Sequence, residues 1–475
     1  MAVVGKLAKA ALISVVSKNA AKKYLLQSLE SSIGLTAKAR QTLAMRMGVP
    51  PNQTEQILAL DDVLQIMEKN APQLLEQIDE IDEIGISASV GQVHRAKLIT
   101  GEMVAIKIQY PDVEKHMLKN LDLLLKIFAD YSPAKNYSFN VSEYKTYLNA
   151  QIKNECNYLL ESHQQIFFQN IFSSSDIIYV PKIYKDFTGS KNLVQEWVPG
   201  ASIPTIDPKL ADQIIPTLLQ ALLKPIFSYH CMHADFHPGN WAYNKQSEKI
   251  ILYDFGSIIQ FTENESQKLK EILTKFLNNN YDVKNDFIQL GFKSDLIGKI
   301  SDEFPYLAKE LFTRFINESN PTDPSLSQSL DDLLGSRKWY FRNAGPPWFM
   351  LFLKSLSGFF FAIKQLQYTK SLRPLISDIC EITTSNLFPN LNDKTLSSPR
   401  SLFISIKKNG TEVCRFQFPC RAIEDIEDLI PSEHRSKLDQ LDINKIKQEV
   451  ISSNYAAQIV FHVSENNNEY RCWIE

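Results

Sequence analysis

The residues of this chain that could do chemistry gather in two motifs, His233-Ala-Asp-Phe-His-Pro-Gly-Asn240 and Asp254-Phe-Gly256. Asp235 precedes Asn240 by five residues, and Asp254 follows the apolar run 250–253, which predicts a β-strand ending at that carboxylate. Phosphoryl transfer needs one carboxylate near the acceptor hydroxyl, and an amide oxygen with a second carboxylate to hold the metal between the phosphates. We therefore expect Asp235 to be catalytic and Asn240 and Asp254 to bind Mg²⁺.

The elements that must position these groups lie upstream. Val104-Ala-Ile-Lys107 predicts a strand whose lysine reaches nucleotide phosphates, although such a lysine can also sit at the edge of a buried strand in solvent. Where a glycine-rich loop would stand, the chain has Ser87, Ala88, Ser89 and Val90 before Gly91. Their backbone N–H groups can approach phosphates with less conformational freedom than glycines allow. The order of motifs predicts a two-lobed, protein-kinase-like α+β fold that binds ATP.

The chain resembles the UbiB family of atypical kinases, also called AarF-type or ADCK-like. The resemblance rests on motifs from about residue 85 to 260, weaker to about 390. They are the segment Ser87–Ala96 with its Gly-Gln-Val-His tail, Val104–Lys107 with Gln109-Tyr-Pro111, Glu155–Tyr158 with Glu161, Val180–Lys182, Gln195–Gly200 and the two catalytic stretches. Membership implies a kinase-like fold, ATPase activity with ATP and Mg²⁺, and a role in isoprenoid-quinone or lipid metabolism.

The resemblance also implies roles for single residues. Lys107 would contact phosphates and pair with Glu161 on a helix, and Glu196 and Val198 would form the hinge that meets the adenine. Glu155 belongs to a Glu-x-Asp motif of the family, but Asn157 replaces the aspartate here. The segment 46–49, which begins with an arginine, corresponds weakly to the family's Lys-x-Gly-Gln. Two roles of that extension stay open, gating of the cleft as the resemblance implies and ordinary helix packing.

The expected organisation has four parts. Residues 1–80 form an N-terminal helical extension, 81–200 the small lobe, 201–392 a helical large lobe and 399–475 a small α+β domain. Within them we expect one helix over 141–172, a buried helix over 346–366, and two hairpins in the last part, the first turning at Asn409-Gly410. The small α+β domain could bind a protein partner or cover the large lobe.

Composition limits the partners. With 475 residues, 44% hydrophobic residues and a net charge of −3, the chain can bury several cores and offers no basic field for nucleic acid. Six scattered cysteines and the lack of a convincing signal peptide favour the cytoplasm. Residues 1–29 carry five lysines and no acid, so they predict an amphipathic helix that lies on an anionic membrane surface or packs on a lobe.

Two other classes of function remain open. A small-molecule phosphotransferase of the aminoglycoside-kinase type shares the H-x-D-x-x-x-x-N pattern, although the 87–92 loop and Gln109-Tyr-Pro111 argue against it. A nucleotide-binding pseudokinase scaffold would use the same cleft with little turnover. The phosphoryl acceptor is not identified by any residue.

Overall fold

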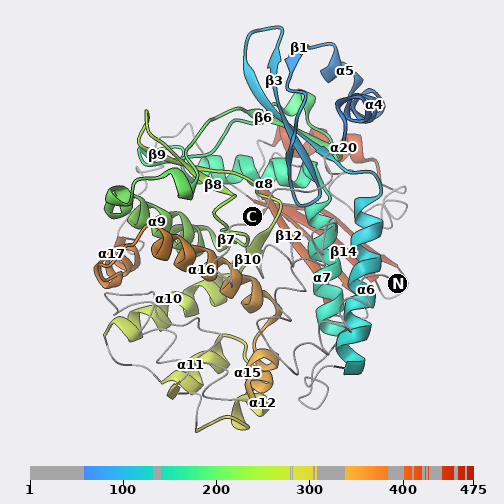
Figure 1. Cartoon of the computed structure of the whole chain (residues 1–475). Coiled ribbons are helices and arrows are strands. Elements are labelled where there is room, and N and C mark those ends of the chain that lie inside the picture. Colours follow the sequence, from blue (N-terminus) through green and yellow to red (C-terminus); the bar gives the residue numbers. More distant parts are fainter. Residues whose placement is uncertain are drawn as a thin grey trace. The chain divides into compact units, whose positions relative to one another are not determined.

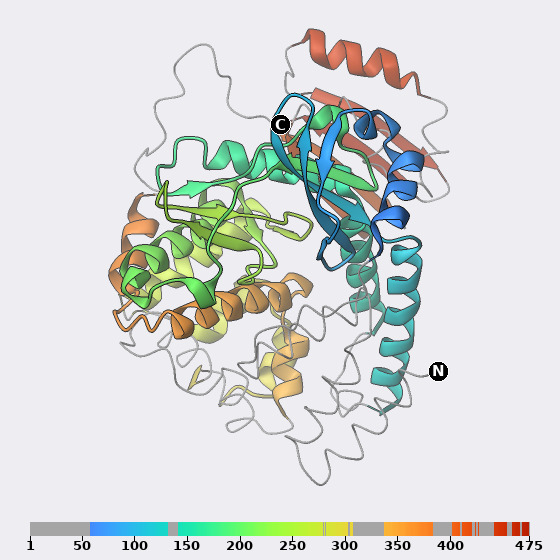
Figure 2. The same ribbon diagram turned by 45° about the horizontal axis from the view of Figure 1, so that its top comes forward.

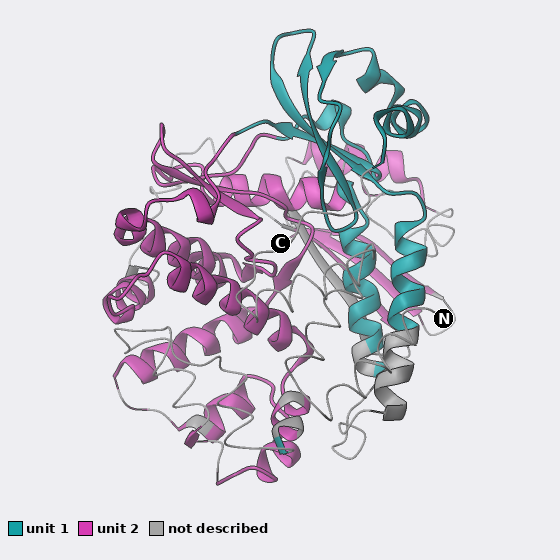
Figure 3. Cartoon of the chain, viewed as in Figure 1, with its two compact units in different colours: residues 1–158, 183–198, 323–339 teal, residues 159–182, 199–322, 340–475 magenta. Residues whose placement is uncertain are grey.

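The computed structural model describes residues 58–131, 141–278, 280, 282–302, 305–306, 337–382, 401–408, 411–419, 423, 426, 441–453, 458–465 and 468–474. The chain forms two compact units, shown in separate colours in Figure 3. Unit 1 comprises residues 1–158, 183–198 and 323–339, and unit 2 comprises residues 159–182, 199–322 and 340–475.

Unit 1 is built on an antiparallel sheet with strand order β1-β3-β4-β6, to which β2 adds by pairing with β3 (Figure 1). Its strands are β1 (Ile78–Ile81), β2 (Ile86–Ser87), β3 (Gly91–Leu98), β4 (Met103–Gln109) and β6 (Asn192–Glu196). Helices α4 (Leu60–Asn70) and α5 (Pro72–Leu75) cover one face, where Val63, Met67 and Leu74 join Val104 and Ile106 in a core. The strand predicted from Val104-Ala-Ile-Lys107 is confirmed as part of β4.

Two long helices complete the described part of unit 1. Helix α6 (Val113–Tyr131) follows β4, and α7 (Val141–Glu155) packs beside it. The expectation of a single helix over 141–172 is wrong, because the helix is interrupted at Cys156 and Asn157 before α8 (Tyr158–Ile171) begins. The backbone N–H of Tyr158 bonds the carbonyl of Ser190 at 3.1 Å instead of continuing the α7 ladder. Asn157 therefore precedes α8 and does not share a helical face with Glu161.

Unit 2 holds α8, the helical region and two small sheets. Strand β5 (Ile178–Tyr179) pairs in parallel with β9 (Lys249–Leu252), which pairs with β8 (Trp241–Asn244); β7 (Cys231–His233) pairs with β10 (Ile258–Gln260). Helix α9 (Ala211–Tyr229) leads into β7 and is buried along most of its length. The predicted strand before Asp254 is confirmed as β9.

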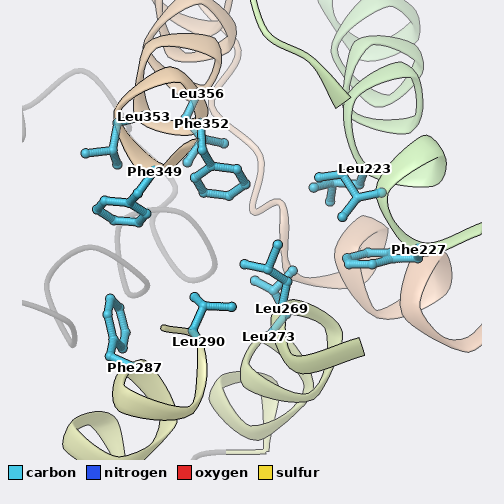
Figure 4. Close-up of a pocket in the computed structure, with 11 residues that line it drawn as sticks. Leu223, Phe227, Leu269, Leu273, Phe287, Leu290, Phe349, Phe352, Leu353 and Leu356 are labelled. Carbon is cyan, nitrogen blue, oxygen red and sulfur yellow. The ribbon is translucent and has the colours of Figure 1, made fainter. Parts of the chain in front are cut away.

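The remaining helices of this region are α10 (Glu263–Leu277), α11 (Val283–Gln289), α12 (Ser294–Gly298), α15 (Lys338–Ala344), α16 (Pro347–Gln365) and α17 (Arg373–Ile382). Helix α16 confirms the buried helix expected over 346–366. One side of it joins α9, α10 and α11 around a wholly apolar pocket, whose labelled side chains converge in Figure 4. Among the described helices, none is both long and apolar enough to cross a bilayer.

The last part of the chain forms a four-stranded antiparallel sheet with order β12-β11-β14-β13. Its strands are β11 (Ser401–Lys408), β12 (Thr411–Pro419), β13 (Gln458–Glu465) and β14 (Asn468–Ile474). Figure 2 shows α20 (Ile443–Ser452) lying along this sheet. Both predicted hairpins are confirmed by the pairing of β11 with β12 and of β13 with β14.

The core of this C-terminal sheet includes one residue from far away in the sequence. Leu402, Ile404 and Cys472 are buried there together with Leu160 of α8, which is 4% exposed. On the other face of the sheet, the rings of Phe403 and Trp473 stack at 5.1 Å. The helix that carries Glu161 is therefore packed into the C-terminal sheet through the residue just before it.

Candidate phosphoryl-transfer site

The loop that carries the expected catalytic Asp235 joins β7 to β8 in unit 2; it is called the catalytic loop below, and its own backbone holds it. The N–H of Ala234 bonds the carbonyl of Ser257 at 2.9 Å, which continues the β7–β10 pairing into the loop. The N–H of His237 bonds the carbonyl of Asp235 at 2.7 Å, and that of Asn240 bonds the carbonyl of His237 at 2.8 Å. These turns bend the segment so that both ends of the motif lie close together.

Two histidines of the motif support the loop through hydrogen bonds. The Nδ1 atom of His233 accepts from the N–H of Asp235 at 3.2 Å, so its Nε2 atom donates to the carbonyl of Tyr253 at 3.3 Å. Nδ1 of His237 accepts from the N–H of Gly239 at 2.9 Å. Burial lowers the pKa of the His233 imidazole below its ordinary value of 6.5, which favours this neutral form.

The two expected metal ligands are brought next to each other by backbone pairing. The N–H of Tyr253 bonds the carbonyl of Asn240 at 2.8 Å, and Nδ2 of Asn240 donates to the carbonyl of Asp235 at 2.9 Å. Because the amide nitrogen points to Asp235, the amide oxygen is the atom of Asn240 suited to a cation. Asp254 has φ of 53°, a left-handed conformation that an aspartate tolerates better than most residues.

Glu161 lies beside the same turn in unit 2. This carboxylate is 2% exposed, and a Cβ atom added to Gly256 would lie 3.4 Å from Glu161 Oε2 and 3.4 Å from Asp254 Oδ1. The glycine therefore leaves room for two carboxylates around it. Two negative charges at one turn, the Glu161 carboxylate buried and the Asp254 carboxylate half-buried, favour a nearby cation. Oxygen donors of this kind suit Mg²⁺, so the residues present fit the metal that the motifs imply.

Phe255, between these groups, anchors the turn. It is 0% exposed, and its ring lies 5.0 Å from that of Phe168 on α8 and 5.4 Å from the imidazole of His233. Asp254, the catalytic loop and the helix of Glu161 thus share one aromatic core. A change in the position of α8 would therefore move the carboxylates of both Glu161 and Asp254.

Helix α16 contributes residues that no motif predicted. Lys354 Nζ lies 2.6 Å from Asp235 Oδ1, and Ser355 Oγ donates to the carbonyl of His233 at 2.7 Å. Gly358 lies so close to the loop that a Cβ atom there would overlap the carbonyl oxygen of Phe236. The available signal was the group of polar residues at Lys354, Ser355 and Ser357 in the middle of a largely apolar helix.

In unit 1, Lys107 lies on the central strand β4, between its register partners Val93 and Leu193. Its side chain is buried, and Nζ lies 4.9 Å from the centroid of the Tyr158 ring. An aromatic face attracts an ammonium group and holds it in place. Lys107 belongs to unit 1 and Glu161 to unit 2, and their pairing stays a prediction.

The expected phosphate loop is a closed hairpin between β2 and β3. Ser87 pairs with Gln92, and the N–H of Ala88 bonds the carbonyl of Gly91 at 2.8 Å. The carbonyl of Val90 accepts from the N–H of Tyr110 at 3.0 Å. A Cβ atom on Gly91 would overlap the carbonyl oxygen of Ile108, so only glycine fits there. The N–H of Ala88 is therefore already bonded within the turn, and Ser89 lies at the tip of the hairpin.

The polar residues after this loop have structural roles. Gln92 and His94 are both 0% exposed; Gln92 Nε2 donates to His94 Nε2 at 2.8 Å, and His94 Nδ1 bonds the carbonyl of Asp82 at 2.9 Å. Gln92 Oε1 also accepts from the N–H of Leu58 at 2.8 Å. His94 is therefore part of the packing of this sheet, and Gln92 links it to the chain before α4.

Gln109 connects the end of β4 to the break between α7 and α8. Its Nε2 atom donates to the carbonyl of Cys156 at 2.7 Å, and its Oε1 atom accepts from Lys191 Nζ at 2.6 Å. Cys156 is a buried free cysteine. Gln109 of the Gln109-Tyr-Pro111 motif therefore holds the backbone just before α8 begins.

The other expected site residues are located as follows. Glu196 ends β6 opposite Val104, and Val198 is the last residue of unit 1 before the chain enters unit 2 at Pro199. Glu155 ends α7 and is 9% exposed. The 46–49 segment and the basic stretch 1–29 lie outside the described residues.

Comparison with known proteins agrees with this arrangement. Residues 49–286 match the model of the ABC1 atypical kinase-like domain, which is half of the chain. Protein ACTIVITY OF BC1 COMPLEX KINASE 1 of Arabidopsis thaliana, chloroplastic, is 30% identical over 54% of this chain and 40% of its own length. Atypical kinase COQ8 of Saccharomyces cerevisiae, mitochondrial, is 28% identical over 42% of this chain and 40% of its own.

The chain thus spans less than half the length of these two curated relatives. The solved complex of Rv3197 with erythromycin from Mycobacterium tuberculosis shares the fold, with a TM-score of 0.50 and 19% identity over 78% of this chain and 98% of that one. The expected kinase-like α+β fold is confirmed. On the matched domain and on its motifs, the chain belongs to the ABC1 atypical kinase-like family, also known as UbiB.

Proposed function

We propose that this chain is an ATP- and Mg²⁺-dependent atypical kinase or ATPase of the UbiB type, which supports isoprenoid-quinone or lipid metabolism. The proposal is carried by one observation: Asp254 and the buried Glu161 converge around Gly256 within unit 2, and backbone bonds from Tyr253 to Asn240 and from Ala234 to Ser257 hold the catalytic loop beside them. Such a set of hard oxygen donors beside a further carboxylate suits a nucleotide with its metal ion. The quinone or lipid role rests on the relatives alone.

Each residue has a proposed role. Asn240 and Asp254 hold Mg²⁺, which would neutralise phosphate charge. Lys107, paired with Glu161, aligns the phosphates under the hairpin that carries Ser87, Ala88, Ser89 and Val90. Glu196 and Val198 meet the adenine, and Asp235 orients the acceptor and accepts its proton. An acceptor held in line by these groups reacts faster because its orientation is fixed before the chemical step.

Further proposed partners are an isoprenoid lipid or an anionic membrane surface, met by the basic residues 1–29, and a protein partner of the C-terminal domain. The proposed location is the cytoplasm, with peripheral contact to a membrane. Nucleic acid is not among the proposed partners, because the net charge is −3.

The first test is Mg²⁺-dependent ATP hydrolysis by the full chain, with and without anionic liposomes. Wild type should turn over, Asp254→Asn should not, and the exposed Asp295→Asn on α12 should behave as wild type. Stimulation by liposomes would support the membrane contact. ATP binding without turnover would favour the scaffold, and phosphorylation of a sugar or drug panel would favour a small-molecule phosphotransferase.

A further inference from the structure

The catalytic loop contains no lysine or arginine of its own, because His233–Asn240 has only histidines as basic residues. A phosphoryl group in transfer carries charge on its outer oxygens and is stabilised by fixed cations. Helix α16 supplies a cation to this loop. Lys354 Nζ lies 2.6 Å from Asp235 Oδ1, with side-chain exposures of 17% and 16%.

Helix α16 is fixed in three places, so this ammonium group is held by a rigid element. At its start, Trp348 Nε1 donates to Glu265 Oε1 at 2.8 Å, and Glu265 is part of the capping box of α10. In the middle, Ser355 bonds the carbonyl of His233. One turn later, Gly358 touches the backbone of Phe236. Lys354 is thereby aimed at Asp235 by contacts on both sides of it.

We propose that Lys354 is a catalytic residue of the site, whose ammonium group contacts the γ-phosphoryl group of ATP while it holds the Asp235 carboxylate. This rests on the proposed function. An ammonium group has three donors and can bond a carboxylate and a phosphate oxygen together. In the step, the acceptor oxygen bonds the γ-phosphorus, the bond to the bridging oxygen breaks with its electron pair left on ADP, and the acceptor proton passes to Asp235 and then to solvent.

An ion pair that only positions Asp235 makes a different prediction from one that also binds phosphate. If Lys354 acts only through Asp235, then Lys354→Met costs nothing further once Asp235 is already Asn. If it contacts the phosphoryl group, the loss persists in the Asp235→Asn background. The ratio of ATP to ADP affinity separates the two cases without turnover, since only ATP carries the γ-phosphate.

The experiment measures kcat, KM and the binding of fluorescent ATP and ADP analogues with Mg²⁺, using the full chain. Lys364→Met is the matched control, because Lys364 is an exposed lysine on the same helix. Lys354→Met should lower kcat about 100-fold, as for the loss of one transition-state donor. It should also reduce the preference for ATP over ADP, and Lys354→Arg should restore part of both.

The outcomes are distinct. The proposal is overturned if Lys354→Met lowers kcat in the wild-type background but not in the Asp235→Asn background. It is also overturned if Lys354→Met leaves the preference for ATP over ADP unchanged. Either result leaves the proposed function standing. A wild type that binds no nucleotide overturns both. Should Lys354→Met fail to fold, as judged by its melting temperature, Lys354→Gln and Lys354→Arg carry the same comparison.

Discussion

Gly358→Ala should show whether helix α16 supports the catalytic loop. Gly358 lies within α16, and a Cβ atom built on it would overlap the carbonyl oxygen of Phe236. The same Cβ would lie 2.9 Å from the carbonyl carbon of Phe236 and 3.5 Å from the Cα atom of His237. Both neighbours are backbone atoms of the loop that carries Asp235, so no side chain can rotate away to make room.

The magnitude follows from these separations. A carbon and an oxygen atom in contact prefer about 3.3 Å or more, so the overlap with the Phe236 carbonyl oxygen requires the helix and the loop to separate by more than roughly 1 Å. Overpacking of this kind costs about 1–3 kcal/mol, while alanine in place of glycine within a helix returns about 1 kcal/mol. We expect the free energy of unfolding to fall by about 0–2 kcal/mol. A displacement near 1 Å at a catalytic group can cost roughly 100-fold in rate.

The assay pairs denaturant unfolding with Mg²⁺-dependent ATP hydrolysis. The matched control is Gly298→Ala on α12, because no atom lies within 4 Å of a Cβ atom there. The control should keep wild-type activity and stability. A Gly358→Ala protein that is as active as wild type and no less stable would refute the close approach of α16 to the loop.

Three further outcomes are expected. Leu160→Ala should lower the free energy of unfolding by about 2–5 kcal/mol, since it empties part of the C-terminal core, and should reduce turnover through the adjacent Glu161; exposed Ile451→Ala is its control, and equal effects of the two would contradict this. Gly91→Ala should weaken binding of a fluorescent ATP analogue, because its Cβ would overlap the Ile108 carbonyl; unchanged affinity would argue against it. Because burial lowers the pKa of His233, its contribution to stability is complete above about pH 6.5 and is lost as pH falls. The free energy of unfolding, measured from pH 8 to 5, should therefore depend less steeply on pH for His233→Gln than for wild type. Parallel slopes of the two proteins would exclude His233 as the cause.

Local sequence patterns were sufficient for much of the fold. The apolar run 250–253 ends at Asp254 in the structure as it does in the sequence, and the Asn-Gly signal at 409–410 joins two paired strands. Periodicity and turn chemistry report on near neighbours, and these elements depend on near neighbours. The break between α7 and α8 was missed for the opposite reason. Gln109 and Ser190, distant in the chain, bond the backbone at Cys156 and Tyr158 there.

The site divides in the same way. Asp235, Asn240 and Asp254 could be named from spacing, because a short loop and one strand pair bring them together. Lys354 could not, because its place depends on the packing of α16 against a loop from which it is remote in sequence; the neighbouring Ser355 bonds a residue 122 positions away.

By itself, the sequence determined the order of the motifs, the groups able to do phosphoryl chemistry and the strands that end at them, since all of these are set within a few residues. Only the tertiary structure decided which distant elements meet those groups. It places the ammonium group of Lys354 beside the carboxylate of Asp235. It also places Leu160, the residue before Glu161, in the core of the C-terminal sheet. Such contacts arise from the burial of apolar helix faces, which fixes their partners only when the whole unit is packed.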